Sequence, residues 1–175
     1  MKAREMTVFC VDDIVMYGNT GVCRVEDIRT ENFSQKECLY YILKPVASEH
    51  STVYCPVNND KIKMRKLLSK EEIDTLIQLT SDTEAVWIEN DSERKERFSA
   101  VLREGEPEGL IRLLKTLHFH QEEKIKEGKK FHASDEKIMR EAEKILHGEF
   151  AQVLHISEEE VVPFIMEKLG ECPEC

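Results

Sequence analysis

The hydrophobic pattern of this chain changes its period once, at Ser69, and this change limits the possible folds more than any other feature. Before Ser69, short runs of β-branched and aromatic residues alternate with turn-forming residues. These runs cover residues 14–17, 21–28, 37–46, 51–57 and 62–66. The polar stretches 30–36 and 47–50 suit hairpin loops. Five short strands in roughly 60 residues predict a small, strongly bent sheet or barrel.

After Ser69 the apolar residues recur at helical spacing. Ser69 and Glu72 fit a capping box, in which each side chain satisfies a backbone amide of the other residue. Pro107 suits the first turn of a helix, where its missing N–H costs nothing, and Gly105 suits the end of the helix before it. The predicted helices are a first one after Ser69, then residues 94–103, 107–117, 134–150 and 157–170.

These two patterns predict an α+β protein with two domains. The polar break at residues 80–85 is the predicted boundary. We therefore expect residues 1–80 to form a five-stranded domain that ends in a short helix, and residues 81–175 to form an all-α helical bundle. Residues 124–130 are predicted to be a basic loop in that bundle.

Composition restricts the function as well as the fold. The formal net charge is −10, which opposes general binding to nucleic acid, because backbone binding depends on basic residues that release counterions from phosphates. No apolar run approaches the roughly 18 residues that a membrane span needs, and the N-terminus is too charged for a signal peptide. We therefore expect a cytoplasmic protein with no membrane partner.

Motifs that indicate catalysis do not occur. The sequence has no phosphate-binding glycine loop, nucleophile elbow or H-E-x-x-H pattern, so we expect neither an enzyme nor a cofactor. Cys172 and Cys175 have the spacing of half a zinc site, but a tetrahedral site needs two more ligands. His118 and His120 are two apart on a predicted helix and point to different faces. We therefore predict no metal site, and we expect Cys10, Cys23, Cys38 and Cys55 to act mainly as small hydrophobic residues.

One family is similar to nearly the whole chain. Residues 9–28 resemble the opening of the CarD/CdnL family of bacterial RNA-polymerase-binding transcription regulators, in which a phenylalanine, a Gly-Asp pair and a valine-tyrosine strand lead to a turn and a Gly-Val. The segments "YYILKP", "VYCPVNND" and "MRKLLSKEEI" continue the resemblance. In the second half it is carried by "REGEPEGLIRLLKTL" and "SDEKIMREAEKILHGEFAQVL".

The resemblance implies a Tudor-like, SH3-like N-terminal domain that binds the β subunit of RNA polymerase, as a domain of the transcription-repair coupling helicase does. It places the polymerase-binding surface at the end of the second strand and on the strand before the Val-Pro-type turn. In this sequence those positions are Arg29, Thr30, Glu31, Val53, Tyr54 and Cys55. An edge strand there can pair with the partner through its backbone, which tolerates changes of side chain.

For the helical domain, the resemblance implies a contact with promoter DNA at the upstream edge of the melted −10 region, which stabilises the open complex. A tryptophan inserted at a partly unstacked base step is the expected device, and Trp87 is the single tryptophan. The residues alone favour packing of Trp87 on the bundle, so both interpretations stay open. The basic positions that match the DNA face are Arg94, Lys95, Arg97, Lys115 and His120.

The acidic net charge is compatible with a DNA contact if the protein is tethered. Residues 94–130 hold 10 Lys and Arg against 7 Asp and Glu, a local balance of +3. A protein docked on polymerase meets upstream DNA at an effective concentration that reaches about the millimolar range. Weak, largely sequence-independent DNA binding then suffices, and we expect a monomer that is nucleoid-associated through the polymerase.

Two other interpretations remain open at this point. In one, the protein is an adaptor whose helical domain binds another protein and makes no DNA contact. In the other, which has less support, it is a small metal-dependent enzyme or zinc protein that uses Cys172, Cys175 and nearby histidines.

Overall fold

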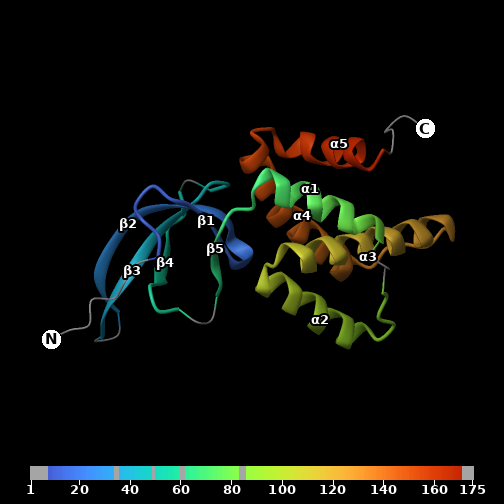
Figure 1. Ribbon diagram of the computed structural model, residues 1–175. Helices are drawn as coiled ribbons and strands as arrows, with labels where there is room; N and C mark the ends of the chain where they lie inside the picture. Colours follow the sequence, from blue (N-terminus) through green and yellow to red (C-terminus); the bar gives the residue numbers. More distant parts are fainter. Residues whose placement is uncertain (1–7, 34–35, 49, 60–61, 83–85, 171–175) are drawn as a thin grey trace. The chain divides into compact units, whose positions relative to one another are not determined.

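Figure 1 shows the computed structural model, which describes residues 8–33, 36–48, 50–59, 62–82 and 86–170. The chain divides into two compact units, Met1–Leu67 and Leu68–Cys175. The division therefore falls earlier than the predicted boundary after residue 80. The reason is the helix that follows Ser69: its buried residues Ile73, Leu76 and Ile77 belong to the core of the second unit.

The first unit is a five-stranded antiparallel sheet over its described residues, as predicted. Its strands are β1 (Ile14–Tyr17), β2 (Gly21–Phe33), β3 (Lys36–Pro45), β4 (Val53–Pro56) and β5 (Met64–Lys66). They pair in the order β4-β3-β2-β1-β5 (Figure 1), so β4 and β5 are the two edge strands.

The second strand runs further than the sequence predicted, and the third begins one residue earlier. β2 spans 13 residues and β3 spans 10, and a β-bulge interrupts their pairing between Val25 and Asp27. Most of the stretch 30–36, predicted to be a hairpin loop from its polar composition, is therefore strand. Pairing with β3 overrides the low strand propensity of these residues, because propensity depends strongly on context.

The core of the first unit lies on one face of this sheet. Tyr41 is buried in this core, and its hydroxyl accepts hydrogen bonds from the N–H groups of Val8 and Phe9 at 3.0 and 3.3 Å. Burial, with a smaller contribution from Cys55, raises the pKa of Cys23 to about 12. The thiol of Cys23 is therefore protonated at neutral pH and packs as a small hydrophobic group, as expected. The buried cluster consists of Phe9, Val15, Tyr17, Cys23, Val25, Tyr41, Leu43 and Cys55.

Positive φ angles occur both before and after β1. Gly21 opens β2 at φ 88°, a conformation that glycine adopts without steric cost. Asp12 has φ 72°, a left-handed conformation that favours glycine. Asp12 thus stands at a glycine-type backbone position.

The second unit consists of five helices over its described residues. They are α1 (Lys70–Asp82), α2 (Asp91–Glu104), α3 (Pro107–Lys126), α4 (Ala133–Leu154) and α5 (Glu158–Leu169). Helix α3 runs to Lys126, so part of the stretch predicted to be a basic loop is helical. None of the helices in the described ranges is long and apolar enough to cross a bilayer.

Local signals in the sequence define most ends of these helices. Both capping boxes form: Glu72 accepts the N–H of Ser69 at 2.7 Å, and Glu160 accepts that of Ser157 at 2.8 Å. Gly105 ends α2 in the left-handed conformation, at φ 63°, and donates its N–H to the carbonyl of Val101. Pro107 begins α3.

The bundle core is built around α3 and α4. These two helices pack on each other, α1 packs on α3, α4 and α5, and α2 packs on α3 and α4. The predicted apolar stripes face inward. Their buried members on α3 and α4 are Leu110, Ile111, Leu113, Leu114, Leu117, Ile138, Met139, Ala142, Ile145, Leu146 and Phe150.

The bundle should lose stability in mild acid because of His147. Burial lowers the pKa of His147, and the charge of His118 lowers it further. The charges of Glu143 and Glu158 act in the opposite direction but do not compensate for burial. The folded state therefore binds this proton less readily than the unfolded state does. The contribution of His147 to the free energy of unfolding is complete above its pKa in the unfolded state, near 6.5. It is lost as the pH falls through that value towards the lower pKa of His147 in the folded state.

We expect the urea midpoint to fall between pH 7.5 and 5.0, and to fall less in His147→Gln. Glu160, whose pKa is lowered by its hydrogen bonds to the Ser157 backbone and side chain, adds a loss of the same sign at lower pH. An equal fall in wild type and His147→Gln would show that His147 is not responsible.

Candidate functional site

The structure separates the six predicted polymerase-binding residues onto two faces of the sheet. Side chains alternate between faces along a strand. Arg29 pairs with Tyr40 across β2 and β3, and Ile42 pairs with Tyr54 across β3 and β4. Arg29, Glu31 and Tyr54 therefore share the face opposite the core. Thr30, Val53 and Cys55 lie on the other face, where Cys55 is buried and Val53 packs against the core.

An exposed aromatic cluster occupies the outer face. Phe33 lies between two tyrosines, with ring centroids 5.3 Å from Tyr40 and 5.4 Å from Tyr54, both edge to face. Phe33 is 46% exposed and Tyr54 is 41% exposed. We call Phe33, Tyr40 and Tyr54 the aromatic triad. The sequence prediction missed Phe33 because it placed this residue in a loop.

Charged residues border the triad. The guanidinium of Arg29 donates to Glu31 at 2.7 Å and to Asp27 at 3.2 Å. The hydrogen bond to Glu31 is the main cause that raises the pKa of Arg29, and it outweighs desolvation, which acts in the opposite direction. Because Arg29 is exposed and the two carboxylates are partly exposed to solvent, these ion pairs are weak, and Arg29 can exchange its carboxylates for those of a partner.

The edge of β4 next to the triad offers backbone groups to a partner. Val57 donates its N–H to the carbonyl of Leu39 at 2.9 Å, so residues 53, 55 and 57 direct their backbone groups towards β3. In an antiparallel ladder the residues between them face the other way. Tyr54 therefore presents its N–H and C=O outward, whereas Pro56 has no N–H to donate.

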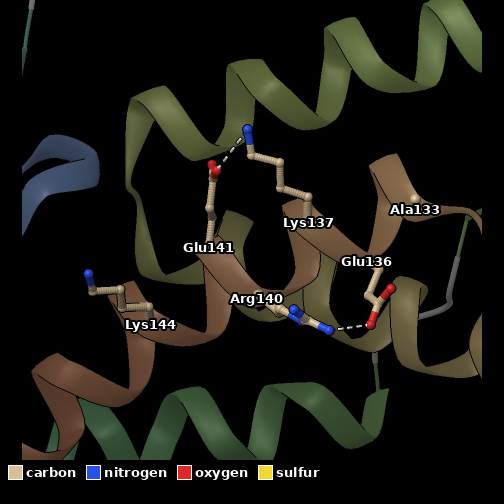
Figure 2. A pocket seen from close by; sticks show the side chains of 6 residues that line it. All are labelled: Ala133, Glu136, Lys137, Arg140, Glu141 and Lys144. Atoms are coloured by element: carbon tan, nitrogen blue, oxygen red, sulfur yellow. Dashed lines mark hydrogen bonds and ion pairs between the residues drawn. The ribbon is translucent and has the colours of Figure 1, made fainter.

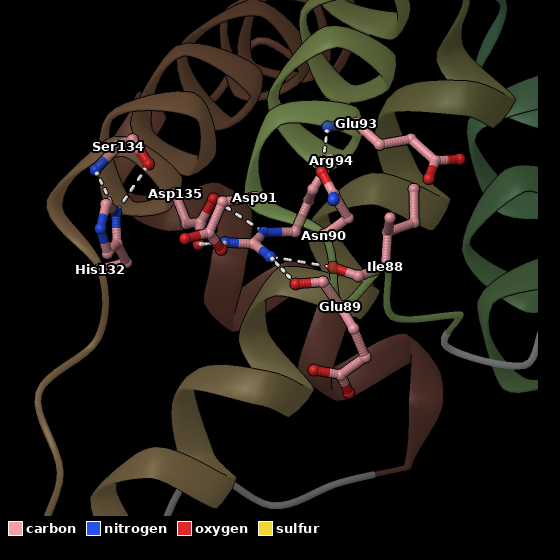
Figure 3. Close-up of polar contacts among 9 residues, drawn as sticks. All are labelled: Ile88, Glu89, Asn90, Asp91, Glu93, Arg94, His132, Ser134 and Asp135. Atoms are coloured by element: carbon pink, nitrogen blue, oxygen red, sulfur yellow. Dashed lines mark hydrogen bonds and ion pairs between the residues drawn. The ribbon is translucent and has the colours of Figure 1, made fainter.

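In the helical unit, Arg94 is not at the surface. It is 4% exposed, and Asp135 is 2% exposed. The guanidinium binds the Asp135 carboxylate with two hydrogen bonds, Nε to Oδ1 at 3.2 Å and Nη2 to Oδ2 at 3.0 Å (Figure 3). Burial alone would lower the pKa of Arg94, but hydrogen bonds to Asp135 and Asp91 raise it overall. The predicted place of Arg94 on an exposed DNA face does not agree with this structure, in which its charge is neutralised inside the bundle.

Trp87 packs on the bundle in this structure. The His120 ring is stacked on it, with centroids 3.4 Å apart and an interplanar angle of 14°. The guanidinium carbon of Arg94 lies over the indole at 4.4 Å, and Phe98 meets it edge to face at 6.2 Å. The packing interpretation therefore describes the free chain.

The other predicted DNA-contacting residues fall into two groups. Lys115 donates from Nζ to the carbonyl of Thr80, near the end of α1, and His120 is covered by Trp87. In contrast, Lys95 and Arg97 are exposed on α2, where Arg97 forms an ion pair with Glu93 at 2.9 Å. Within the described residues, these two cations remain candidates for a contact with phosphate.

A shallow hollow on α4 has no groups that converge on a ligand. Figure 2 shows its lining, which comes from one helix: Ala133, Glu136, Lys137, Arg140, Glu141 and Lys144. Ion pairs between successive turns join Arg140 to Glu136 and Lys137 to Glu141. This is the pattern of a solvated helix face.

No group of three or more metal-binding side chains comes together within the described part of the chain. His118 pairs with Glu143 at 3.1 Å, whereas His120 stacks on Trp87, so the two histidines point apart as expected. Cys172 and Cys175 lie outside the described residues.

The comparison with known families assigns the first unit. Residues 9–68 match the family model of the CarD-like/TRCF RID domain, and this span includes the whole sheet, with the triad and the β4 edge. The first unit is therefore a Tudor-like, RNA-polymerase-interacting domain. The match is to one domain of the chain, and it is consistent with a CarD-like protein. The chain as a whole matches no curated protein.

Proposed function

We propose that this protein is a bacterial, cytoplasmic transcription regulator without catalytic activity. Its first unit docks on the β subunit of RNA polymerase. Its helical unit then contacts promoter DNA at the upstream edge of the −10 region and stabilises the open complex. The observation that carries the proposal is the match of residues 9–68 to a polymerase-interacting domain.

The docking surface in this proposal is the outer face of the sheet. The aromatic triad supplies apolar area beside the outward-facing N–H and C=O of Tyr54. A partner strand that pairs with β4 would gain backbone hydrogen bonds from this edge and side-chain contacts from the triad. Interface hot spots are enriched in tyrosine, and aromatic rings bring large contact areas at low entropic cost.

The DNA contact in this proposal rests on α2. Lys95 and Arg97 are two of its exposed cations, and the edge of Trp87, at the entrance to the helix, is the apolar element. Such a surface is weak by itself in a chain of formal charge −10. Docking on polymerase makes it effective, because tethering raises the local concentration of DNA. The protein acts as a monomer in this scheme.

A second candidate function is that of an adaptor whose helical unit binds another protein. It is favoured by the internal contacts of Arg94, Lys115, His120 and Trp87, which are four of the six residues assigned to DNA by resemblance. An adaptor would still bind polymerase, but its effect on promoter opening would not depend on the cations of α2.

We expect Lys95→Glu to shorten the lifetime of the open complex several-fold. Reversing one phosphate-contacting charge should also reduce the slope of log lifetime against log salt by about one unit. Trp87→Ala should shorten the lifetime as well, with little change in salt dependence. The measurement is decay of heparin-resistant complexes on one promoter.

Lys137→Glu, the same charge reversal at an exposed position of α4, is the matched control and should leave the lifetime unchanged. If Lys95→Glu and Trp87→Ala both behave as wild type while still binding polymerase, the DNA contact is refuted in favour of the adaptor.

A further inference from the structure

Arg94 uses all of its hydrogen-bond donors to join the segment around Trp87 to the bundle. A guanidinium has five N–H donors. Beyond the two bonds to Asp135, Nη2 donates to Asp91 Oδ1 at 2.6 Å, and Nη1 donates to the carbonyls of Ile88 and Glu89 at 2.9 and 3.4 Å (Figure 3). All five donors are used, so none remains for a phosphate.

These bonds connect parts of the chain that are distant in sequence. Asp135 lies in the first turn of α4, Asp91 begins α2, and the two carbonyls belong to the segment between α1 and α2. One side chain thus holds the residues that follow Trp87 against α4. A planar fork suits this task because it bonds several acceptors in fixed directions.

The same guanidinium also sets the position of the indole. It lies over the ring of Trp87 at 4.4 Å from the centroid, a favourable cation–π distance. His120 is stacked on the same indole, with ring centroids 3.4 Å apart. Arg94 and His120 together therefore hold the ring of Trp87 against the bundle.

We propose that Arg94 is the positioning residue of Trp87. It acts through the loop carbonyls, Asp135 and the indole face, and it does not contact DNA. This inference rests on the proposed function only where it concerns the promoter. The placement of Trp87 itself is a property of the free protein, and it can be tested without polymerase.

The first test uses the single tryptophan of the chain as a fluorescent probe. Arg94→Lys keeps the charge but cannot form the fork, and Asp135→Asn removes the charge of its partner. We expect acrylamide quenching constants to rise at least about twofold in both variants, at unchanged far-ultraviolet circular dichroism. Arg97→Lys, the same substitution at an exposed site on α2, should match wild type.

Asp91→Asn weakens one exposed contact of the same guanidinium and should give a smaller rise in quenching. It keeps the test decisive if the buried variants do not fold. Unchanged quenching in every variant that retains the wild-type circular dichroism would overturn the proposal.

The second test asks whether Arg94 acts through Trp87 at the promoter. Open-complex lifetimes are measured with Trp87→Ala, Arg94→Lys and the double variant. We expect Arg94→Lys to shorten the lifetime, and the double variant to be no shorter-lived than Trp87→Ala alone. A further shortening in the double variant would overturn a role through Trp87. If Trp87→Ala leaves the lifetime unchanged, the promoter role of Trp87 fails, and the quenching result alone decides the positioning role.

Discussion

Asp135→Ala should destabilise the helical unit by about 3–5 kcal/mol. The substitution removes the carboxylate that accepts two hydrogen bonds from Arg94. The guanidinium stays buried without its main counter-charge, and breaking one side of a buried ion pair costs this much. Urea unfolding followed by circular dichroism at 222 nm measures the loss.

Asp91→Ala is the matched control, because Asp91 binds the same guanidinium from an exposed position. Its side chain is 74% exposed, so we expect a loss below about 1 kcal/mol. If Asp135→Ala lowers the free energy of unfolding no more than Asp91→Ala does, burial of the Arg94–Asp135 pair contributes little to stability.

The double variant Arg94→Met, Asp135→Leu separates the value of the ion pair from the cost of leaving one charge alone. A buried pair gains Coulomb energy but loses hydration, and apolar residues of similar volume often replace it without loss of stability. We expect the double variant to recover much of the stability that Asp135→Ala loses. It should not restore the low quenching of Trp87, because the loop carbonyls then have no donor from this side chain.

Tyr54→Ala and Phe33→Ala should each lower the affinity for the polymerase β subunit by about 10- to 100-fold. Each substitution removes one ring from the aromatic triad, and truncation of a central aromatic residue typically costs about 1.4–2.7 kcal/mol of binding free energy. Both rings are exposed in the free protein, so stability should change little. Titration of the full chain against immobilised β subunit measures the affinity.

Two controls separate the triad from a general effect of lost aromatic surface. Phe119 is 55% exposed on α3, and Phe119→Ala should bind β subunit as wild type does. Tyr54→Phe keeps the ring and the outward-facing backbone, so it should retain most of the affinity. Equal losses for Phe119→Ala and Phe33→Ala would exclude the triad as the docking surface.

The sequence by itself determined the features that depend on neighbouring residues. The Ser69 and Ser157 capping boxes, Pro107 at the start of α3 and the left-handed end at Gly105 all formed as predicted. Each satisfies backbone groups within one helical turn, so a short window of sequence contains all the atoms involved. The approximate positions of the strands and helices also follow from local patterns, whereas the far part of β2 depends on its pairing with β3.

Only the tertiary structure decided which side chains face solvent and which face each other. Arg94 looks like any surface cation in the sequence, and Asp135, its partner, lies 41 residues away. Phe33 joins Tyr40 and Tyr54 only through the register of three strands. Helix α1 belongs to the second unit because its apolar stripe packs on helices much further along the chain. Contacts between distant segments depend on the whole fold, whereas helix caps and periodicity depend on sequence neighbours alone.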